Sequence, residues 1–383
     1  MKYILKCKEV FLEDEVKNNY SILIDDGIIR TIDKDINHNC NVIDLSKYKA
    51  IPGLVDLHIH GGNGYDTMDG TYESLNGISK FVARYGVTSF LPTTVTAPMD
   101  NIEKAVINLK ETMEKGVDGA EILGLYLEGP YLTEEHKGAH PPSFMRPLNL
   151  EEIQRLIDLS SNNIRIITIA PEKKGSNEVI KYLKDSGVKV SIGHTNATYD
   201  EVMDAFDIGA SIGVHTFNGM RGLHHREPGV VGAILNRREV YAELIADNIH
   251  VHPGVMSILY RLKDSDKMYL ISDCMRAGGL KDGEYMLGEL KVIVKNSIAR
   301  TQNGSLAGSS LKIIEALKNI INATGISLHE AVKMATITPA RALNLDNSIG
   351  SIKENKKANI AIIDDELNVV MTIINGKIAH KNF

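Results

Sequence analysis

The chain has 383 residues, of which 43% are hydrophobic and 24% charged, and its formal net charge is −6. These values are ordinary for a folded globular protein, and no segment approaches the roughly 20 consecutive apolar residues that a membrane span needs. A net negative charge without a cluster of Lys and Arg argues against nucleic acid as a partner. Three widely spaced cysteines and the early charged residues, which interrupt any apolar signal segment, lead us to expect a cytoplasmic protein.

Eight short apolar runs, each ending in polar or glycine-rich residues, follow one another through the middle of the chain. Buried strands that alternate with helices form a parallel sheet, and eight such units close into a (β/α)₈ barrel of the TIM type. A doubly wound open sheet is the structural alternative. The predicted strands are residues 51–58, 87–95, 120–128, 164–170, 188–193, 210–215, 241–247 and 267–273.

The segments between these runs have the periodicity of helices. Apolar residues from Leu75 to Tyr85 lie on one helical face, and the pattern stops at Gly86. Capping-box spacing, with a short polar residue followed three positions later by Glu, predicts where two further helices begin. These pairs are Asp100 with Glu103 and Thr198 with Glu201.

The two ends of the chain differ from this middle. Residues 1–50 and 347–383 lack clear helices and alternate apolar with polar residues, as short antiparallel strands do. Each end carries a hairpin signal, Asp26-Gly27 and Asn375-Gly376, in which both residues tolerate positive φ. We therefore expect both termini to form one small β-sandwich domain beside a barrel of residues 51–346.

Two histidines, His58 and His60, end the first predicted strand. Side chains two apart in a strand point to the same face, so both imidazoles are expected at the carboxyl-terminal mouth of the barrel. Imidazole is a good ligand for Zn²⁺ or Fe²⁺. By itself the pair is equally consistent with histidines that bond to the backbone at an ordinary strand end.

Further candidate ligands recur at the ends of strands three, five, six and eight: Glu128, His194, His215 and Asp273. All these ends meet at the rim of a barrel that carries catalysis. We expect Glu128, His194 and His215 to hold a divalent metal that activates a water. Asp273 is then placed to take the proton of that water and to deliver it to a leaving amine, as amide hydrolysis requires. The histidine pair of the first strand supplies a second metal position or orients the first.

Polar and small residues also gather in loops that follow the predicted strands. Loops on this rim of a barrel contact substrate, although ordinary solvated polarity is the alternative for any one of these residues. Arg226 offers a planar fork for phosphate or carboxylate. The other groups are His136 to His140, Asn218 to Met220, His250, and the small-residue turn Ser305 to Ser309.

At these residues the sequence resembles the amidohydrolase superfamily and, within it, the family of N-acetylglucosamine-6-phosphate deacetylases. The resemblance extends over nearly the whole chain. The segments that carry it are Pro-Gly-Leu-Val-Asp-Leu-His-Ile-His-Gly at 52–61, Leu-Glu-Gly-Pro at 127–130, Lys-Gly-Ala-His at 137–140, Gly-His-Thr-Asn-Ala at 193–197, His-Thr-Phe-Asn-Gly-Met at 215–220, His-His-Arg-Glu-Pro-Gly at 224–229 and Leu-Ala-Gly-Ser at 306–309.

The resemblance implies a homodimer that hydrolyses the acetamide of an amino sugar phosphate, with one or two ions of Zn²⁺ or Fe²⁺. It implies that Asp273 is the acid and base and that His140 polarises the acetyl carbonyl. The implied metal ligands are Glu128, His194 and His215, and the His58 and His60 pair resembles the branch that holds a second ion. The implied substrate contacts are Ala139, His140, Asn218, Gly219, Arg226, His250, Leu306, Ala307 and Gly308.

Two positions depart from the family pattern. Asn248 stands where Gly is expected in an Asp-Gly-x-His turn, which Asn tolerates because it adopts left-handed backbone readily. Cys274 and Met275 follow Asp273 where smaller residues are usual. This second departure suggests a thiol near the metal and an activity that is sensitive to oxidation.

Two alternative functions use the same residues. The first keeps the barrel and the metal but assigns another amide, such as a cyclic ureide or an N-acyl amino acid. The second is a non-catalytic homologue that kept the barrel as a scaffold. Presence of every candidate ligand together with Asp273 argues against the second alternative.

Overall fold

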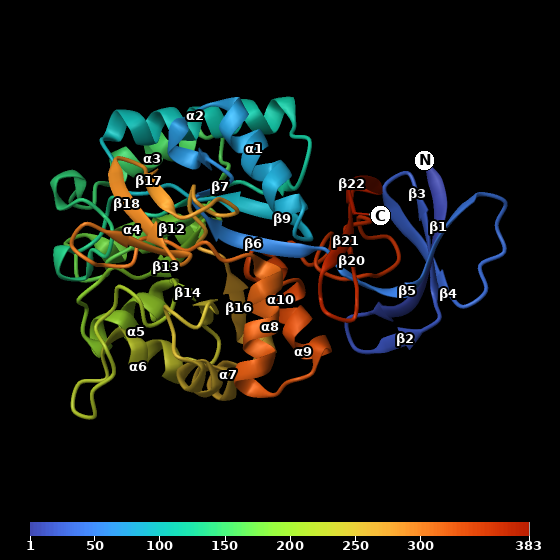
Figure 1. Cartoon of the computed structure of the whole chain (residues 1–383). Coiled ribbons are helices and arrows are strands. Elements are labelled where there is room, and N and C mark those ends of the chain that lie inside the picture. The colour runs from blue at the N-terminus through green and yellow to red at the C-terminus, as the bar shows by residue number, and fades with distance from the viewer. Residues whose placement is uncertain (383) are drawn as a thin grey trace.

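The computed structural model describes residues 1–382 and shows a large α/β barrel beside a smaller β domain (Figure 1). All eight predicted barrel strands occur within these residues: β6 (Leu54–Ile59), β9 (Val87–Pro92), β11 (Leu125–Leu127), β12 (Ile164–Ile169), β13 (Lys189–Ile192), β14 (Ile212–Gly213), β15 (Tyr241–Ile245) and β16 (Met268–Ile271). β6 pairs with β9, and β11 to β16 form a six-stranded parallel sheet in chain order. Bridges Thr93–Tyr126 and Ile59–Cys274 join these two sheets into a ring. The predicted TIM-type barrel is therefore confirmed, and the doubly wound alternative is wrong.

Helices cover the outside of this ring, which is why the strands are apolar on both faces. Every residue of β6 and of β9 is buried. The helices within the described residues are α1 (Tyr72–Ala83), α2 (Met99–Lys115), α3 (Leu150–Leu159), α4 (Ser176–Asp185), α5 (Tyr199–Ile208), α6 (Gly229–Asn236), α7 (Pro253–Lys267), α8 (Ile313–Thr324), α9 (Leu328–Met334) and α10 (Ile337–Ala342), with the short 3-10 turns η1 (Thr67–Asp69), η2 (Glu134–His136) and η3 (Pro142–Phe144).

Of the two predicted capping boxes, one is present at the start of its helix and the other is not. The capping box of Thr198 and Glu201 is present at the start of α5, so that prediction is confirmed. The box predicted at Asp100 and Glu103 is wrong, because α2 begins two residues earlier, at Met99, with Pro98 at its N-cap. Asp100 therefore lies inside the first turn, where an acidic side chain still interacts favourably with the helix dipole.

Both ends of the chain contribute strands to one eight-stranded sheet. Its members are β1 (Lys2–Phe11), β2 (Val16–Asn18), β3 (Ser21–Asp25), β4 (Ile28–Asp33), β5 (Asn41–Pro52), β20 (Ile360–Ile363), β21 (Val369–Ile374) and β22 (Lys377–Lys381). Both predicted hairpins are present, with positive φ at Asp26-Gly27 and at Asn375-Gly376. The prediction of short antiparallel strands throughout is wrong for the pairing of β1 with β5, which are long and lie parallel to each other at the edge of β1 that the β3–β4 hairpin leaves free. Their other neighbours are antiparallel, β3 beside β1 and β20 beside β5.

A three-stranded sheet that the sequence did not predict lies between the last barrel strand and α8. It consists of β17 (Gly283–Leu287), β18 (Leu290–Lys295) and β19 (Ile298–Thr301), joined as antiparallel neighbours. Its own small core, which includes Val292 and Ala307, also packs against Ala139 from the loop after β11. The sheet therefore brings residues 283–309 to the mouth of the barrel. Three shorter strands complete the fold, namely β7 (Gly61–Gly62), β8 (Tyr65–Asp66) and β10 (Glu121–Ile122).

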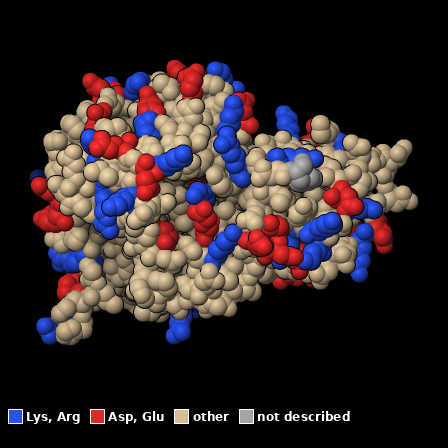
Figure 2. Space-filling model, viewed as in Figure 1, with Lys and Arg blue, Asp and Glu red and all other residues tan. Residues whose placement is uncertain are grey.

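The surface shows how the charged residues are distributed. On the face seen in Figure 2, Lys and Arg lie among Asp and Glu over both the barrel and the terminal domain. Within residues 1–382, no helix combines the length and the apolar character that crossing a bilayer requires.

Candidate active site

The predicted metal ligands and the predicted acid and base lie at the carboxyl ends of five barrel strands, and all are buried. The ligands are His58 at the end of β6, His60 directly after it, Glu128 after β11, His194 after β13 and His215 after β14, and the acid and base is Asp273 after β16. Three of these residues have positive φ, which is 47° at His194, 25° at His215 and 48° at Asp273. Left-handed backbone in a residue other than glycine is strained and persists where the surrounding structure holds it, typically at functional sites.

One cluster joins Glu128, His194 and His215. Glu128 Oε1 lies 3.2 Å from His194 Nε2 and 3.0 Å from His215 Nε2. The two Nε2 atoms are 3.1 Å apart. Two ligand atoms that are each about 2.1 Å from one tetrahedral ion are separated by about 3.4 Å. The spacing in this cluster is therefore close to that of a metal site.

Hydrogen bonds behind the rings decide which nitrogen faces the centre. His194 Nδ1 donates to the carbonyl of His136 at 2.8 Å, and His215 Nδ1 donates to the carbonyl of Asn218 at 3.2 Å. In a neutral ring whose Nδ1 carries the proton, Nε2 presents a lone pair. Two lone pairs and a carboxylate oxygen thus converge, and a cation at this point removes their mutual repulsion.

A second cluster joins His58, His60 and Asp273, whose candidate ligand atoms all lie within 4.8 Å of one another. Asp273 Oδ1 lies 3.1 Å from His60 Nε2 and 3.7 Å from His58 Nε2. Glu128 connects the clusters, because its Oε2 lies 3.2 Å from His60 Nε2 and 3.4 Å from His58 Nε2. His58 Nε2 has no hydrogen-bond partner although it is buried. The donors therefore fit two neighbouring cations with Glu128 between them.

Asp273 is set up to act as a base. Burial raises the pKa of its carboxyl, but the hydrogen bond from His60 and the charges that His58, His60 and His215 carry when they are protonated outweigh burial and hold the pKa at about 2. A cation at the clusters would take the place of these protons and act on the carboxyl in the same direction. The side chain is consequently ionised at neutral pH and is able to accept a proton. It also lines the pocket above the clusters, where a substrate is accessible.

His140 is set up as a neutral hydrogen-bond donor. Burial and the charge of neighbouring His194 lower the pKa of His140 to about 4, so the ring is uncharged at neutral pH. The backbone N–H of Thr96 donates to His140 Nδ1 at 3.2 Å. The ring proton must then sit on Nε2, which lies 3.6 Å from Glu128 Oε2 on the metal side. His140 is thus able to donate to a substrate oxygen beside the metal.

A cavity of about 260 Å³ opens above the two clusters. Most of the residues predicted to bind metal or substrate line it. These are His60, Glu128, Ala139, His140, His194, His215, Asn218, Gly219, His250, Asp273, Leu306 and Gly308, and they are joined by Val95, Gly138, Ile245, Leu287 and Ser305.

Three predicted residues lie outside this lining. His58 sits beneath it, fully buried. Ala307 packs into the core of the β17–β19 sheet, and its N–H bonds to the carbonyl of Ala299 at 3.1 Å. Arg226 is exposed on the loop before α6, with its Nη1 2.8 Å from His225 Nε2. In this chain neither Ala307 nor Arg226 reaches the cavity.

Comparison with known proteins now identifies the chain, because residues 50–379 match the model of the Amidohydrolase family. The chain belongs to the amidohydrolase family.

Curated relatives of this amidohydrolase cover almost its whole length. It is 42% identical over 355 residues to the N-acetylglucosamine-6-phosphate deacetylase of Vibrio furnissii, which covers 92% of this chain and 89% of that protein. It is 40% identical over 379 residues to the N-acetylgalactosamine-6-phosphate deacetylase of Escherichia coli O157:H7, with coverage of 99% and 100%. The N-acetylglucosamine-6-phosphate deacetylase structure from Pasteurella multocida superposes with a TM-score of 0.94 at 30% identity, covering 99% of each chain. The resemblance inferred from the motifs is confirmed, and the protein is a hydrolase.

The two departures from the family pattern have different outcomes in this amidohydrolase. Asn248 has a φ of 63°, so it adopts the left-handed backbone that a Gly at that position would supply. Cys274 does not face the metal cluster, because it alternates with Asp273 and lines a small cavity among Ile59, Phe81 and other residues beneath α1. Burial raises the pKa of its thiol. The expectation of a reactive thiol at the metal is therefore wrong.

Several residues around the site escaped the sequence analysis. Leu287 comes from the β17–β19 sheet, whose strands lack the length and apolar character of the barrel strands. Thr96 has no recognisable motif, although both its backbone N–H and its hydroxyl contact His140 Nδ1. Glu243 had a usable signal, since an acid in the apolar run 241–247 requires a partner when it is buried.

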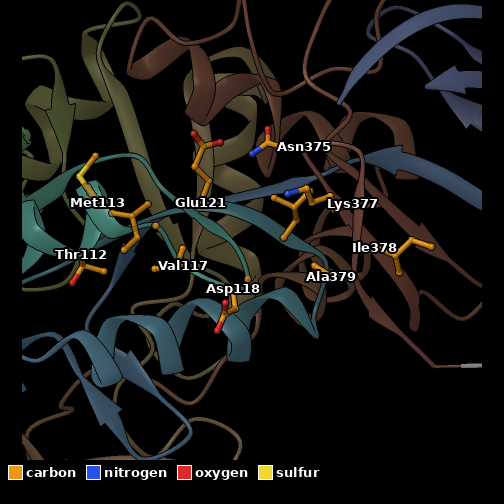
Figure 3. A pocket seen from close by; sticks show the side chains of 13 residues that line it. Thr112, Met113, Val117, Asp118, Glu121, Asn375, Lys377, Ile378 and Ala379 are labelled. Carbon is orange, nitrogen blue, oxygen red and sulfur yellow. The ribbon is translucent and has the colours of Figure 1, made fainter. Parts of the chain in front are cut away.

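A larger cavity, of about 520 Å³, lies away from the metal clusters (Figure 3). It is lined by the end of α2, by residues around Glu121 on β10 and by the β21–β22 hairpin, which includes Asn375 and Lys377. No histidine or cysteine is among its lining residues in the described part of the chain. Of the two cavities, the one above the histidines therefore carries the groups that hydrolysis needs.

Proposed function

We propose that this amidohydrolase removes the acetyl group from N-acetylglucosamine 6-phosphate, giving glucosamine 6-phosphate and acetate. The observation that carries the proposal is the double cluster around Glu128, with ionised Asp273 and neutral His140 facing one cavity. Relatives from Vibrio furnissii and Pasteurella multocida carry the name of this enzyme. Cyclic ureides and N-acyl amino acids have no comparable support, and a non-catalytic barrel does not account for a complete ligand set.

We assign the cation to Glu128, His194 and His215, with His58, His60 and Asp273 around a second position. A bound Zn²⁺ or Fe²⁺ polarises the acetyl carbonyl and makes a water acidic enough to lose its proton near neutral pH. Glu128 offers one carboxylate oxygen to each position. The histidines present Nε2 because their Nδ1 atoms are held by acceptors behind the rings.

The proton transfers are assigned to Asp273. Its carboxylate accepts a proton from the attacking water, and the same group then protonates the amine that leaves as the C–N bond breaks. The His140 Nε2–H donates to the acetyl oxygen, where negative charge develops as the carbonyl carbon becomes tetrahedral. Buried Thr96 keeps that proton on Nε2 throughout.

The sugar phosphate is assigned to Asn218, Gly219 and His250 at the cavity wall. His250 has a defined proton position, because its Nδ1 lies 2.6 Å from Asp247 Oδ2. The backbone around Ala139 and from Leu306 to Gly308 adds contacts with the substrate. Ala307 contributes indirectly, because it shapes the turn that carries Leu306 and Gly308. We assign Arg226 to a substrate phosphate bound in the cavity of a second copy of the chain, because its side chain is exposed and does not line the cavity of its own chain.

A homodimer follows from that assignment of Arg226. Leu223 on the same loop is 62% exposed, which is unusual for a large apolar side chain and fits burial against a second copy. We also assign residues 1–50 and 347–383 to a β-sandwich that folds over its own core, and residues 51–346 to the catalytic barrel. The cytoplasm suits a protein whose three cysteines are free.

We predict that Arg226→Ala raises KM for the phosphorylated sugar and leaves kcat nearly unchanged, because the guanidinium binds a group remote from the reacting amide. A charged hydrogen bond of this kind contributes about 1.5–3 kcal/mol, which corresponds to roughly 10- to 150-fold in KM. Steady-state kinetics measure the change. Mixing Arg226→Ala with Asp273→Asn subunits tests the assignment to the partner, because mixed dimers then regain a low KM; no recovery contradicts it.

A second candidate substrate is N-acetylgalactosamine 6-phosphate, which differs only in the configuration at C4. The relative from Escherichia coli O157:H7 that carries this activity in its name covers 99% of the chain. Comparing kcat/KM for the two epimers decides between them. The glucosamine assignment requires the higher value for N-acetylglucosamine 6-phosphate.

Acetate release tests the function directly. We expect purified protein loaded with Zn²⁺ or Fe²⁺ to release acetate from N-acetylglucosamine 6-phosphate and far more slowly from unphosphorylated N-acetylglucosamine. Metal analysis of the same sample ties the activity to bound ions. An absence of acetate from both phosphorylated epimers contradicts the proposal.

A further inference from the structure

A buried carboxylate that the proposed chemistry does not use lies directly behind the metal clusters. Glu243 is on β15, its side chain is fully buried, and it does not line the cavity. Its Oε2 accepts from His58 Nδ1 at 3.1 Å and from the backbone N–H of His215 at 3.1 Å. Its Oε1 accepts from the hydroxyl of Tyr269 at 2.9 Å. The N–H of His215 and the hydroxyl of Tyr269 both donate to this side chain, so each of its oxygens serves as an acceptor.

His58 differs from the other three histidines of the clusters in what holds its ring. The Nδ1 atoms of His60, His194 and His215 each lie within hydrogen-bond distance of a neutral backbone carbonyl. The Nδ1 of His58 instead faces the carboxylate of Glu243. A carboxylate behind a histidine ligand fixes its tautomer and makes its other nitrogen a stronger donor to a metal.

The other side of the His58 ring is unsatisfied. Its Nε2 is buried and has no hydrogen-bond partner, and it points toward Glu128 Oε2 at 3.4 Å and Asp273 Oδ1 at 3.7 Å. With the proton held at Nδ1, this Nε2 presents a lone pair to two carboxylate oxygens. The three atoms therefore need a positive charge between them, which either a proton on Nε2 or a divalent cation supplies.

The negative charge of the buried carboxylates also indicates a cation at the second cluster. Glu128, Asp273 and Glu243 are three carboxylates within one buried network of imidazoles. The ion-pair partner of Glu243 in the described part of the chain is His58, and no Lys or Arg there pairs with any of the three. Buried charge requires compensation, and three negative charges exceed what one divalent cation neutralises.

We propose that Glu243 is a positioning residue that, through His58, gives the second cluster its affinity for a divalent cation. The inference rests on the proposed function only in taking both clusters as the metal centre. Glu243 touches neither the cation nor the substrate. Its contacts with the His58 ring and with the His215 backbone also link the two metal positions mechanically.

Glu243→Gln separates the charge of this group from its shape. The amide oxygen is able to accept from both His58 and His215, as Oε2 does now, and the amide NH₂ is able to donate to the Tyr269 hydroxyl. The ring of His58 therefore keeps its orientation while the negative charge is lost. Tyr269→Phe is the matched control, because it removes one neutral donor but leaves the carboxylate and its bonds to His58 and His215.

The experiment dialyses wild type and both variants against buffers of graded free Zn²⁺ and measures bound Zn²⁺ by elemental analysis. We expect two binding steps in the wild type, with the weaker step shifted about 10- to 100-fold to higher free Zn²⁺ in Glu243→Gln. In Glu243→Gln the tighter binding step shifts much less. In Tyr269→Phe both binding steps occur at the same free Zn²⁺ as in the wild type. Thermal unfolding of the metal-free proteins shows whether a variant is merely unfolded, in which case both steps are lost.

Three results overturn the inference: a single binding step in the wild type, an unchanged weaker step in Glu243→Gln, or an equal shift in Tyr269→Phe. None of them depends on the substrate. Conversely, a protein that binds two ions but releases no acetate contradicts the proposed deacetylation and leaves the role of Glu243 intact. The two failures are therefore distinguishable.

Discussion

Asp273→Asn is expected to lower kcat by about 10²- to 10⁴-fold, the usual contribution of a positioned acid or base. Asn has nearly the same shape but accepts no proton at neutral pH, whereas the pKa of Asp273 is held at about 2 and its carboxylate is ready to do so. KM is expected to change little, because the side chain acts on the water and the leaving amine. Steady-state kinetics with N-acetylglucosamine 6-phosphate measure the effect.

Metal analysis must accompany this measurement. The cation held by Glu128, His194 and His215 is expected to stay bound, because Asp273 belongs to the other cluster. Glu121→Gln is the control: it also replaces a carboxylate by an amide, but Glu121 pairs with Lys357 outside the metal clusters. A kcat that is unchanged in Asp273→Asn, or equally reduced in Glu121→Gln, contradicts the assigned role.

The barrel was predictable because its sequence signals are local and repeated. Each strand run is apolar on both faces, and each helix carries a stripe of period 3.6, so the pattern survives without knowledge of tertiary contacts. The hairpins at Asp26-Gly27 and Asn375-Gly376 were predictable for a related reason, since few residues adopt positive φ easily. The parallel pairing of β1 with β5 depends on which edge the β3–β4 hairpin leaves free, which no local pattern encodes.

The ligand atoms of the site were predictable for the same geometric reason. In a closed parallel barrel every strand ends at one rim, so residues as distant as His58 and Asp273 are brought together by topology alone. The residues behind the ligands were not predictable. Thr96 contacts His140 through its backbone N–H and its hydroxyl, and Glu243 contacts His58 across the barrel interior. Which residues lie behind a histidine depends on how its imidazole ring is oriented, and the periodicity of a strand does not predict that orientation.

Arg226 illustrates a limit of a different kind. Its sequence context matches the family motif, yet the side chain lies on an exposed loop outside the cavity of its own chain. The sequence identifies a residue type suited to phosphate but not the cavity that its side chain reaches. Cys274 is a similar case, because it follows Asp273 in sequence but its side chain lines a different cavity.

Glu128→Gln is expected to remove bound metal and, with it, activity. Glu128 offers one carboxylate oxygen to each cluster, with Oε1 3.0 Å from His215 Nε2 and Oε2 3.2 Å from His60 Nε2. The amide group replaces one of these oxygens by an NH₂, which offers no lone pair to a cation, and it removes the charge that both positions share. Loss of this residue therefore weakens both positions, whereas loss of Asp273 weakens one.

The measurement is elemental analysis after gel filtration in buffer of low free Zn²⁺, with circular dichroism to show that the barrel is folded. Glu121→Gln serves as the control, because Glu121 pairs with Lys357 at 2.8 Å, outside the metal clusters, and its loss should leave metal content unchanged. Full occupancy in Glu128→Gln contradicts the assignment of Glu128 as a ligand. The metal content of the two variants, compared with each other, is the stricter test. If Asp273→Asn keeps one ion while Glu128→Gln keeps none, Glu128 joins two cations that the remaining side chains hold separately.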